Sequence, residues 1–228
     1  MAIAQPKTKR GETSRAVILQ AALDLFQQRG YDATTMRAIA GHAGVSLGSS
    51  YHYFPSKEHL VLEFYRHTHE LHAAAIAPLL SREKDLAGRL RGTIRAVVIT
   101  CEPFHTVAGS IFSTVANPSS PLNPFGAAAK PLRDEVVALY GEVVNGSDAR
   151  IPADIAEMLP LMLWLYQMGI LYFWIFDRSP GRLRTLEVID ETTDLIVRLI
   201  ALANVPILRG SRKRILGMIK NIVEGRVS

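Results

Sequence analysis

Hydrophobic residues recur at spacings of three and four along most of the chain, whereas alternation at every second position is almost absent. The first spacing is typical of helices with one buried face and the second of strands, so the pattern predicts an all-α protein. We expect helices over residues 14–29, after Thr34-Thr35, and over 46–54, 57–80, 84–101, 104–116, 130–145, 153–176 and 186–204.

Glycine and proline residues mark the breaks between these helices. Gly30 is placed to end the first helix, and Gly44 supplies the positive φ that a tight turn after the second helix needs. Ser46 follows that turn and can cap the third helix. Pro55 breaks the chain before the fourth helix, and three prolines fall within residues 117–126, the clearest loop.

The stretch over residues 14–54 has the proportions of a helix-turn-helix, in which a tight turn containing glycine joins two short helices. Its third helix, 46–54, is rich in small polar and aromatic hydroxyl residues and poor in aliphatic ones. Small residues let a helix lie close to a major groove, and hydroxyl groups can bond phosphates. The composition favours a DNA-reading helix, with a surface helix of no special role as the alternative.

Many residues in this region match the sequence pattern of a known protein family. They are Ile18, Leu19, Ala21, Ala22, Leu23, Leu25, Phe26, Gly30, Tyr31, Thr34, Thr35, Ile39, Ala40, Ala43, Gly44, Val45, Ser46, Gly48, Tyr51, Tyr53, Phe54, Ser56, Lys57 and Glu58. Through these residues the segment 14–64 resembles the DNA-binding domain of the TetR (tetracycline repressor) family. The resemblance implies an all-helical homodimer that has a variable ligand-binding body and leaves its operator DNA when ligand binds.

The resemblance also implies roles for single residues. It assigns phosphate contacts to Thr35, Tyr51, Tyr53 and Lys57. It places Arg37 at a base edge or phosphate. It turns Leu47, Gly48, Ser49 and His52 toward the groove floor. The predicted DNA-binding residues are Thr35, Arg37, Ser46, Leu47, Gly48, Ser49, Tyr51, His52, Tyr53 and Lys57.

Two positions of the third helix depart from the family pattern. Leu47 stands where a polar residue is common, and it could touch a thymine methyl group instead. Ser50 replaces the usual aliphatic residue, so we do not expect it to point into the core, and the third helix should be loosely anchored in the absence of DNA. Phe54 is expected to be a core residue.

Charge is concentrated at the two ends of the chain. Residues 1–57 carry a net charge of +4 and residues 206–228 carry +5, whereas the middle carries −4. Basic ends suit a polyanionic partner, although solvated tails would show the same pattern. Cys101 is the single cysteine and no secretion signal opens the chain, so a reducing cytoplasm is expected.

Residues 158–176 form an uncharged run long enough to span a bilayer. Pro160, Gln167 and Gly169 interrupt the run, which favours a helix buried on both faces of a protein over a membrane span. One face would line a cavity, and the other would meet a partner subunit. In TetR-like proteins the last two long helices of each subunit pack into an intersubunit four-helix bundle, which implies a homodimer here.

Aromatic and methionine side chains in the body suggest a pocket for a lipophilic small-molecule effector, with ordinary core packing as the alternative for any one of them. The candidate ligand-binding residues are Cys101, Phe104, His105, Phe112, Trp164, Gln167, Met168, Leu171 and Tyr172.

Few features point to other chemistry. His69 and His72 are spaced for one helix face but His67 points elsewhere, so no metal is expected, and no cofactor. No phosphate-binding glycine loop or nucleophile–base arrangement is recognisable, so no enzyme is expected.

The sequence therefore predicts a ligand-responsive DNA-binding transcriptional regulator, a repressor released from its operator by the effector. An activator of the same fold and a membrane-associated regulator are the alternatives. The predicted parts are a basic flexible arm (1–11), a helix-turn-helix domain (12–57), a ligand-binding and dimerisation domain (58–205) and a basic amphipathic C-terminal helix (206–228). That last helix could dock on the body, touch DNA or an anionic membrane surface, or stay mobile.

Overall fold

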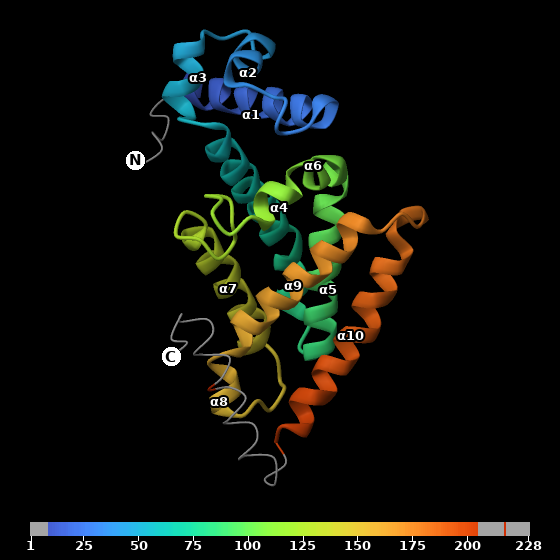
Figure 1. Ribbon diagram of the computed structural model, residues 1–228. Coiled ribbons are helices and arrows are strands. Elements are labelled where there is room, and N and C mark those ends of the chain that lie inside the picture. The colour runs from blue at the N-terminus through green and yellow to red at the C-terminus, as the bar shows by residue number, and fades with distance from the viewer. Residues whose placement is uncertain (1–8, 205–216, 218–228) are drawn as a thin grey trace. The chain divides into compact units, whose positions relative to one another are not determined.

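The computed structural model describes residues 9–204 and residue 217. Helices and the loops between them make up the described residues, with no strand among them, as the hydrophobic spacing predicts (Figure 1). The chain forms two compact units: Met1–Leu71 with Cys101–Arg133, here unit 1, and His72–Thr100 with Asp134–Ser228, here unit 2. The predicted domain limits stay predictions. Residues 1–8 of the predicted arm, and the C-terminal helix apart from Gly217, lie outside the described residues.

Unit 1 contains the N-terminal helices and a later segment of the chain. Its helices are α1 (Lys9–Arg29), α2 (Met36–His42), α3 (Leu47–Tyr53), the first part of α4 (Lys57–Arg82), the short 3-10 helix η1 (Glu102–Phe104) and α6 (His105–Ala116). Helix α1 begins at Lys9 rather than at Ser14, so residues 9–11 of the predicted flexible arm are helical. Glu12 lies in the first turn, where a negative charge stabilises the start of a helix.

One face of α1 is buried in the core of unit 1. Ile18, Ala22, Leu25 and Phe26 are each at most 1% exposed. Helix α6 packs against α1 and adds Val107 and Ile111 to the same core, and Leu122 joins them from the proline-rich loop. Unit 1 therefore depends on a segment that lies far along the chain from the predicted helix-turn-helix.

Unit 2 contains the remaining helices, and α9 and α10 run side by side in opposite directions (Figure 1). Its helices are the last part of α4, most of α5 (Leu86–Cys101), most of α7 (Lys130–Asn145), α8 (Ala153–Ala156), α9 (Leu159–Phe176), the 3-10 helix η2 (Pro180–Arg182) and α10 (Leu183–Leu202). The single helix predicted over 153–176 is wrong: the chain breaks at Glu157-Met158. Pro160 falls in the first turn of α9, where its missing N–H costs no helical hydrogen bond.

A buried arginine ties three helices of unit 2 together. Arg89, on α5, is 2% exposed. Its guanidinium donates to the carbonyl oxygens of Leu80 (2.6 Å) and Glu83 (2.7 Å) at the end of α4, and of Glu142 (2.7 Å) and Val143 (2.7 Å) near the end of α7. The last carbonyls of a helix have no partner within it, so one side chain here satisfies the ends of two helices.

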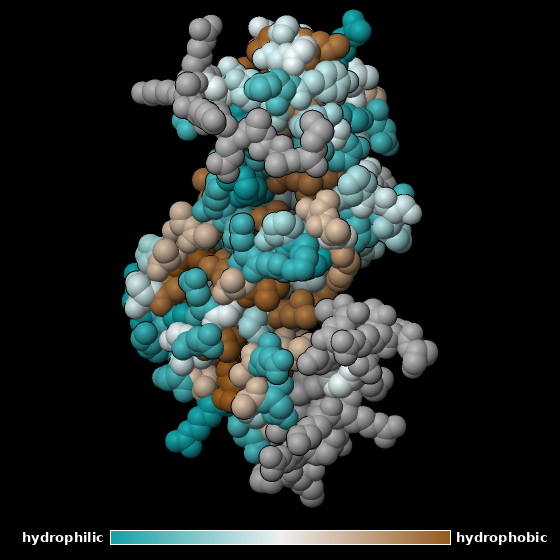
Figure 2. Space-filling model, turned by 90° about the vertical axis from the view of Figure 1, so that its left-hand side faces the viewer, coloured by the Kyte–Doolittle hydropathy of each residue, from teal (hydrophilic) through white to brown (hydrophobic). Residues whose placement is uncertain are grey.

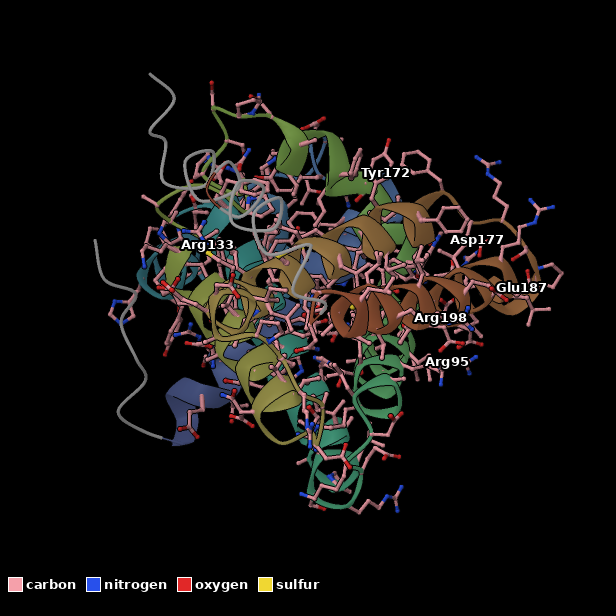
Figure 3. The ribbon with its side chains drawn as sticks, turned by 90° about the horizontal axis from the view of Figure 1, so that it is seen from below. Arg95, Arg133, Tyr172, Asp177, Glu187 and Arg198 are labelled. Carbon is pink, nitrogen blue, oxygen red and sulfur yellow. The ribbon has the colours of Figure 1, made fainter. Side chains whose placement is uncertain are left out.

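Two ion-paired arginines on α5 hold α10. Arg95 donates to Asp190 with Nε at 3.0 Å from Oδ1, and its side chain lies beside α10 in Figure 3. Arg91 lies 3.4 Å from the same carboxylate and also pairs with Asp194. All four side chains are between about one-third and one-half exposed, so each pair contributes little alone.

A carboxylate organises the turn between α9 and α10. The Asp177 Oδ1 atom accepts from the Ser179 N–H (2.8 Å), and Oδ2 accepts from the Thr185 N–H (2.9 Å) and hydroxyl (2.7 Å). Asp177 is 5% exposed, and Figure 3 places it at the end of α9. Burial alone would raise the pKa of this carboxyl, but the hydrogen bonds from Thr185 and Ser179 hold the pKa well below its ordinary value.

We expect Asp177→Asn to lower the free energy of unfolding at pH 7 by about 2 to 3 kcal/mol, because an amide cannot accept all three bonds as a carboxylate does. The folded pKa lies below the unfolded value, so this stabilisation is present above about pH 4 and is lost as the pH falls through the folded pKa. Urea denaturation of both proteins at pH 7 and pH 3 measures the effect. An equal difference in the free energy of unfolding between the two proteins at pH 7 and pH 3 would contradict this role of the Asp177 carboxylate.

Candidate nucleic-acid interface

The turn between α2 and α3 has the geometry of a helix-turn-helix. Thr35 caps α2 by accepting from the Ala38 N–H (3.2 Å), and Ser46 caps α3 by accepting from the Ser49 N–H (3.1 Å). Gly44 adopts a φ of 66° between the two helices, in the left-handed region that favours glycine. Local side-chain hydrogen bonds therefore fix where each helix begins, as the sequence predicts for Ser46.

The outward face of α3 consists of small and aromatic residues. Gly48, Tyr51 and His52 are exposed, and the Tyr51 side chain is 48% exposed. At Gly48 no other atom lies within 4 Å of the place where a Cβ would stand, so this part of the helix is open to an approaching surface. Ser49 is half-buried.

The inward face of α3 differs from the expectation in one residue. Ser50 is fully buried, and its hydroxyl donates to the Leu47 carbonyl at 2.8 Å. The expectation that Ser50 would avoid the core is wrong, because this bond within the helix satisfies the hydroxyl when water is excluded. Phe54, where α3 ends, is also fully buried, as predicted. Leu47 and Tyr53 are partly buried against the same core, so they lie between the two faces.

The two basic residues among the predicted DNA contacts differ in their surroundings. Arg37 on α2 is exposed. Lys57 at the start of α4 donates to the Tyr31 carbonyl at 2.8 Å, and its Nζ lies 4.2 Å from the centre of the Tyr31 ring. The Tyr31 hydroxyl in turn donates to Glu58 at 3.1 Å. Lys57 would have to leave or share these partners to reach a phosphate.

The candidate ligand-binding residues fall into two groups in different units. In unit 1, Cys101, Phe104, His105 and Phe112 are partly buried, and the Phe104 ring packs edge-to-face on Phe64 with centroids 4.9 Å apart. Burial raises the pKa of the Cys101 thiol to about 12, so this thiol is protonated at neutral pH.

In unit 2, the candidates include both core and surface residues. Trp164 and Gln167 are buried, Met168 and Leu171 are partly buried, and Tyr172 is 55% exposed. The carbonyl of the Gln167 side chain accepts from the Tyr140 hydroxyl at 2.8 Å. Tyr140 is fully buried on α7 and was missed in the sequence, because nothing in its neighbourhood on the chain links it to residue 167.

The histidines that drew attention in the sequence lie on α4. His72 is buried, with Nε2 at 3.1 Å from the Thr93 carbonyl, whereas His67 is exposed. The two rings therefore lie in different environments on the same helix. Within the described residues, no three histidine, cysteine, aspartate or glutamate side chains are grouped as metal ligands would be.

Helix α9 is long and apolar enough to cross a membrane by length and composition alone, and it is the one described helix with these properties. Leu163, Trp164, Ile170 and Trp174 on this helix are nevertheless buried inside the protein. Core helices of globular proteins share this composition, so the helix is weak evidence for a membrane span.

Both parts of the chain match families of known proteins. Residues 18–64 match the family described as "Bacterial regulatory proteins, tetR family". Residues 89–211, more than half of the chain, match the "Tetracyclin repressor-like, C-terminal domain". The chain belongs to the TetR family. The resemblance predicted from residues 14–64 is therefore confirmed, and the second match extends it over the body.

Similarity to individual proteins either covers a smaller part of the chain or is lower in sequence identity. The HTH-type transcriptional repressor KstR2 of Mycobacterium tuberculosis is 35% identical over 101 residues, which are 44% of this chain and 48% of that protein. The chain thus matches less than half the length of the first curated relatives. A TetR-family regulator of Syntrophomonas wolfei has a similar structure (TM-score 0.66, 22% identity, 82% of this chain and 95% of that one). Thermus thermophilus FadR in complex with lauroyl-CoA is also similar in structure (TM-score 0.58, 22% identity, 78% of this chain and 92% of that one).

Proposed function

We propose that this TetR-family protein is a ligand-responsive transcriptional repressor that binds operator DNA as a homodimer. The observation that carries the proposal is the exposed face of α3, with Gly48, Tyr51 and His52, on a helix whose opposite face is fixed in a core by Ser50 and Phe54. A rigid helix with an open polar and aromatic face suits a major groove. Family membership and the KstR2 repressor relatives support the same function.

The proposed DNA contacts divide into two kinds. Arg37 would make a charged contact with a base edge or a phosphate, and His52 and Ser49 would face the groove floor. Thr35, Tyr51, Tyr53 and Lys57 would fix the register on the phosphates. The partial burial of Leu47 leaves one edge of its side chain for an apolar contact such as a thymine methyl group.

The proposed dimer uses α9 and α10. Large apolar side chains are exposed on both helices of a single chain: Tyr172, Phe173, Phe176, Leu195, Leu199 and Leu202. Exposed apolar side chains of this size are typical of a protein–protein interface, and burying them against a second copy would remove them from water. Figure 2 shows the left-hand side of Figure 1, where hydrophobic residues lie among hydrophilic ones, whereas α10 lies on the right-hand side of Figure 1, away from this face. A cytoplasmic homodimer therefore accounts for the apolar composition of α9 without a membrane.

The proposed effector is a lipophilic small molecule. The candidate residues in each unit are mainly aromatic and aliphatic, and Gln167 and Tyr140 offer polar groups among them. The complex of the similarly folded FadR with lauroyl-CoA is consistent with this class. A ligand that favours one conformation of the body by about 2.7 kcal/mol would weaken DNA binding about a hundredfold.

Selection of genomic DNA fragments by the purified full-length protein tests the function. We expect enriched fragments to share an inverted repeat whose half-sites lie about one helical turn apart, and sedimentation to give the mass of two chains. Binding should weaken steeply with salt because phosphates are neutralised. Enrichment of no common site, or a protein that sediments as a single chain, would contradict the proposal.

A further inference from the structure

Arg15 and Glu63 form a buried ion pair that joins two helices of unit 1. Arg15 lies on α1 and Glu63 on α4, 48 residues later, and their side chains are only 13% and 7% exposed. The guanidinium donates through two nitrogens, with Nη2 at 2.6 Å from Oε2 and Nε at 3.2 Å from Oε1. Such a two-point contact fixes the plane of the arginine as well as its position.

Glu63 also binds a second arginine. Arg66, one turn later on α4 and 46% exposed, donates to both oxygens of Glu63, with Nε at 3.2 Å and Nη2 at 2.5 Å. Burial would raise the pKa of Glu63, but the hydrogen bonds from Arg66 and Arg15 hold the pKa below its ordinary value. The carboxylate is therefore charged at neutral pH and holds Arg15 firmly.

The Arg15 guanidinium also contacts the end of α3. Its Cζ lies 5.1 Å from the centre of the Phe54 ring. Phe54 is fully buried, ends α3, and donates its N–H to the Ser50 carbonyl at 2.9 Å. One side chain thus contacts α4 through an ion pair and α3 through an aromatic face.

We propose that Glu63 and Arg15 are positioning residues for DNA recognition, in which Glu63 holds Arg15 against Phe54 and thereby fixes the last turn of α3. The proposal rests on the proposed function. Helix α3 has only two turns, so a loosened end affects the turn that carries Tyr51 and His52. Neither residue needs to touch DNA, because both act through Phe54.

A pair of matched variants of the full-length protein tests this role. Arg15→Gln and Arg66→Gln each remove one guanidinium from Glu63, but only Arg15 bridges from α1 to the Phe54 ring. We expect Arg15→Gln to speed amide hydrogen exchange over residues 47–54 by about tenfold relative to 36–42, and to weaken binding to the selected DNA by about tenfold. Arg66→Gln should change both by less than about threefold.

Arg15→Lys keeps the charge but lacks the planar two-point geometry, so it should show the same local effect if Arg15→Gln does not fold. Glu63→Gln should speed exchange over residues 47–54 and weaken DNA binding as the Arg15 variants do. Equal effects of the Arg15 and Arg66 variants on exchange, or exchange over 47–54 unchanged in both Arg15 variants, would overturn the proposal. If the wild-type protein selects no DNA, the proposed function fails, and the exchange comparison still decides whether Arg15 holds α3.

Discussion

Replacing Arg37 or Tyr51 by alanine should weaken specific operator binding by about a hundredfold or more, while the protein remains a folded dimer. Both side chains are exposed, Arg37 on α2 and Tyr51 on α3, so their removal leaves the core of unit 1 intact. A two-point contact between arginine and guanine contributes about 1 to 3 kcal/mol of discrimination, and a hundredfold change in affinity corresponds to about 2.7 kcal/mol. Gel-shift titration with the selected DNA and sedimentation of each variant measure the two properties.

Arg29→Ala is the matched control for charge. Arg29 ends α1 and is exposed in the same unit, but no DNA contact is proposed for it. Its removal takes away one positive charge, so it reports the general electrostatic contribution to binding. Tyr51→Phe removes only the hydroxyl, so comparing it with Tyr51→Ala separates the contribution of the hydroxyl to binding from that of the ring. Operator affinity unchanged in Arg37→Ala and Tyr51→Ala, or lowered equally in Arg29→Ala, would remove α2 and α3 from the proposed interface.

Features of the fold that depend on local chemistry were predictable from the sequence. The caps at Thr35 and Ser46 and the left-handed turn at Gly44 involve residues close along the chain, and short-range rules describe them. Where two local signals compete, the prediction was less accurate. Pro160 lies inside an apolar run that predicts one helix, but it falls in the first turn of a new helix that begins at Leu159, after the break at residues 157–158.

Features that depend on distant partners were not predictable. Ser50 is buried by the packing of α3 within unit 1, where α3 contacts α2, and a serine alone on the chain gives no sign of it. Arg15 pairs with Glu63, which lies 48 residues away along the chain, and Tyr140 bonds Gln167, which lies 27 residues away. A single sequence identifies each side chain as polar but does not pair them. The predicted DNA contacts also stay predictions, because exposure places a residue at a surface and says nothing of what binds there.

The largest effect on stability should come from Arg89→Met. Methionine can fill much of the space of the arginine stem, but it donates none of the four hydrogen bonds to the carbonyls of Leu80, Glu83, Glu142 and Val143. Each buried carbonyl left without a partner costs about 1 to 3 kcal/mol. The total should be smaller than four such losses, because the Glu142 carbonyl keeps its bond from the Gly146 N–H and the two helix ends can partly relax. We expect a loss of about 3 to 5 kcal/mol in the free energy of unfolding, and a melting temperature lower by about 10 °C.

Two further variants test whether the buried guanidinium causes this effect. Arg91→Met removes a partly exposed arginine from the same helix and should cost less than about 1 kcal/mol. At Gly146 a Cβ would stand 2.2 Å from Nη2 of Arg89, so Gly146→Ala should destabilise the wild-type protein by displacing the guanidinium. The same substitution should cost much less in the Arg89→Met background, because the two changes affect one set of hydrogen bonds and cannot add. Additive losses in the double variant, measured by thermal and urea unfolding, would show that Arg89 does not hold the ends of α4 and α7 together.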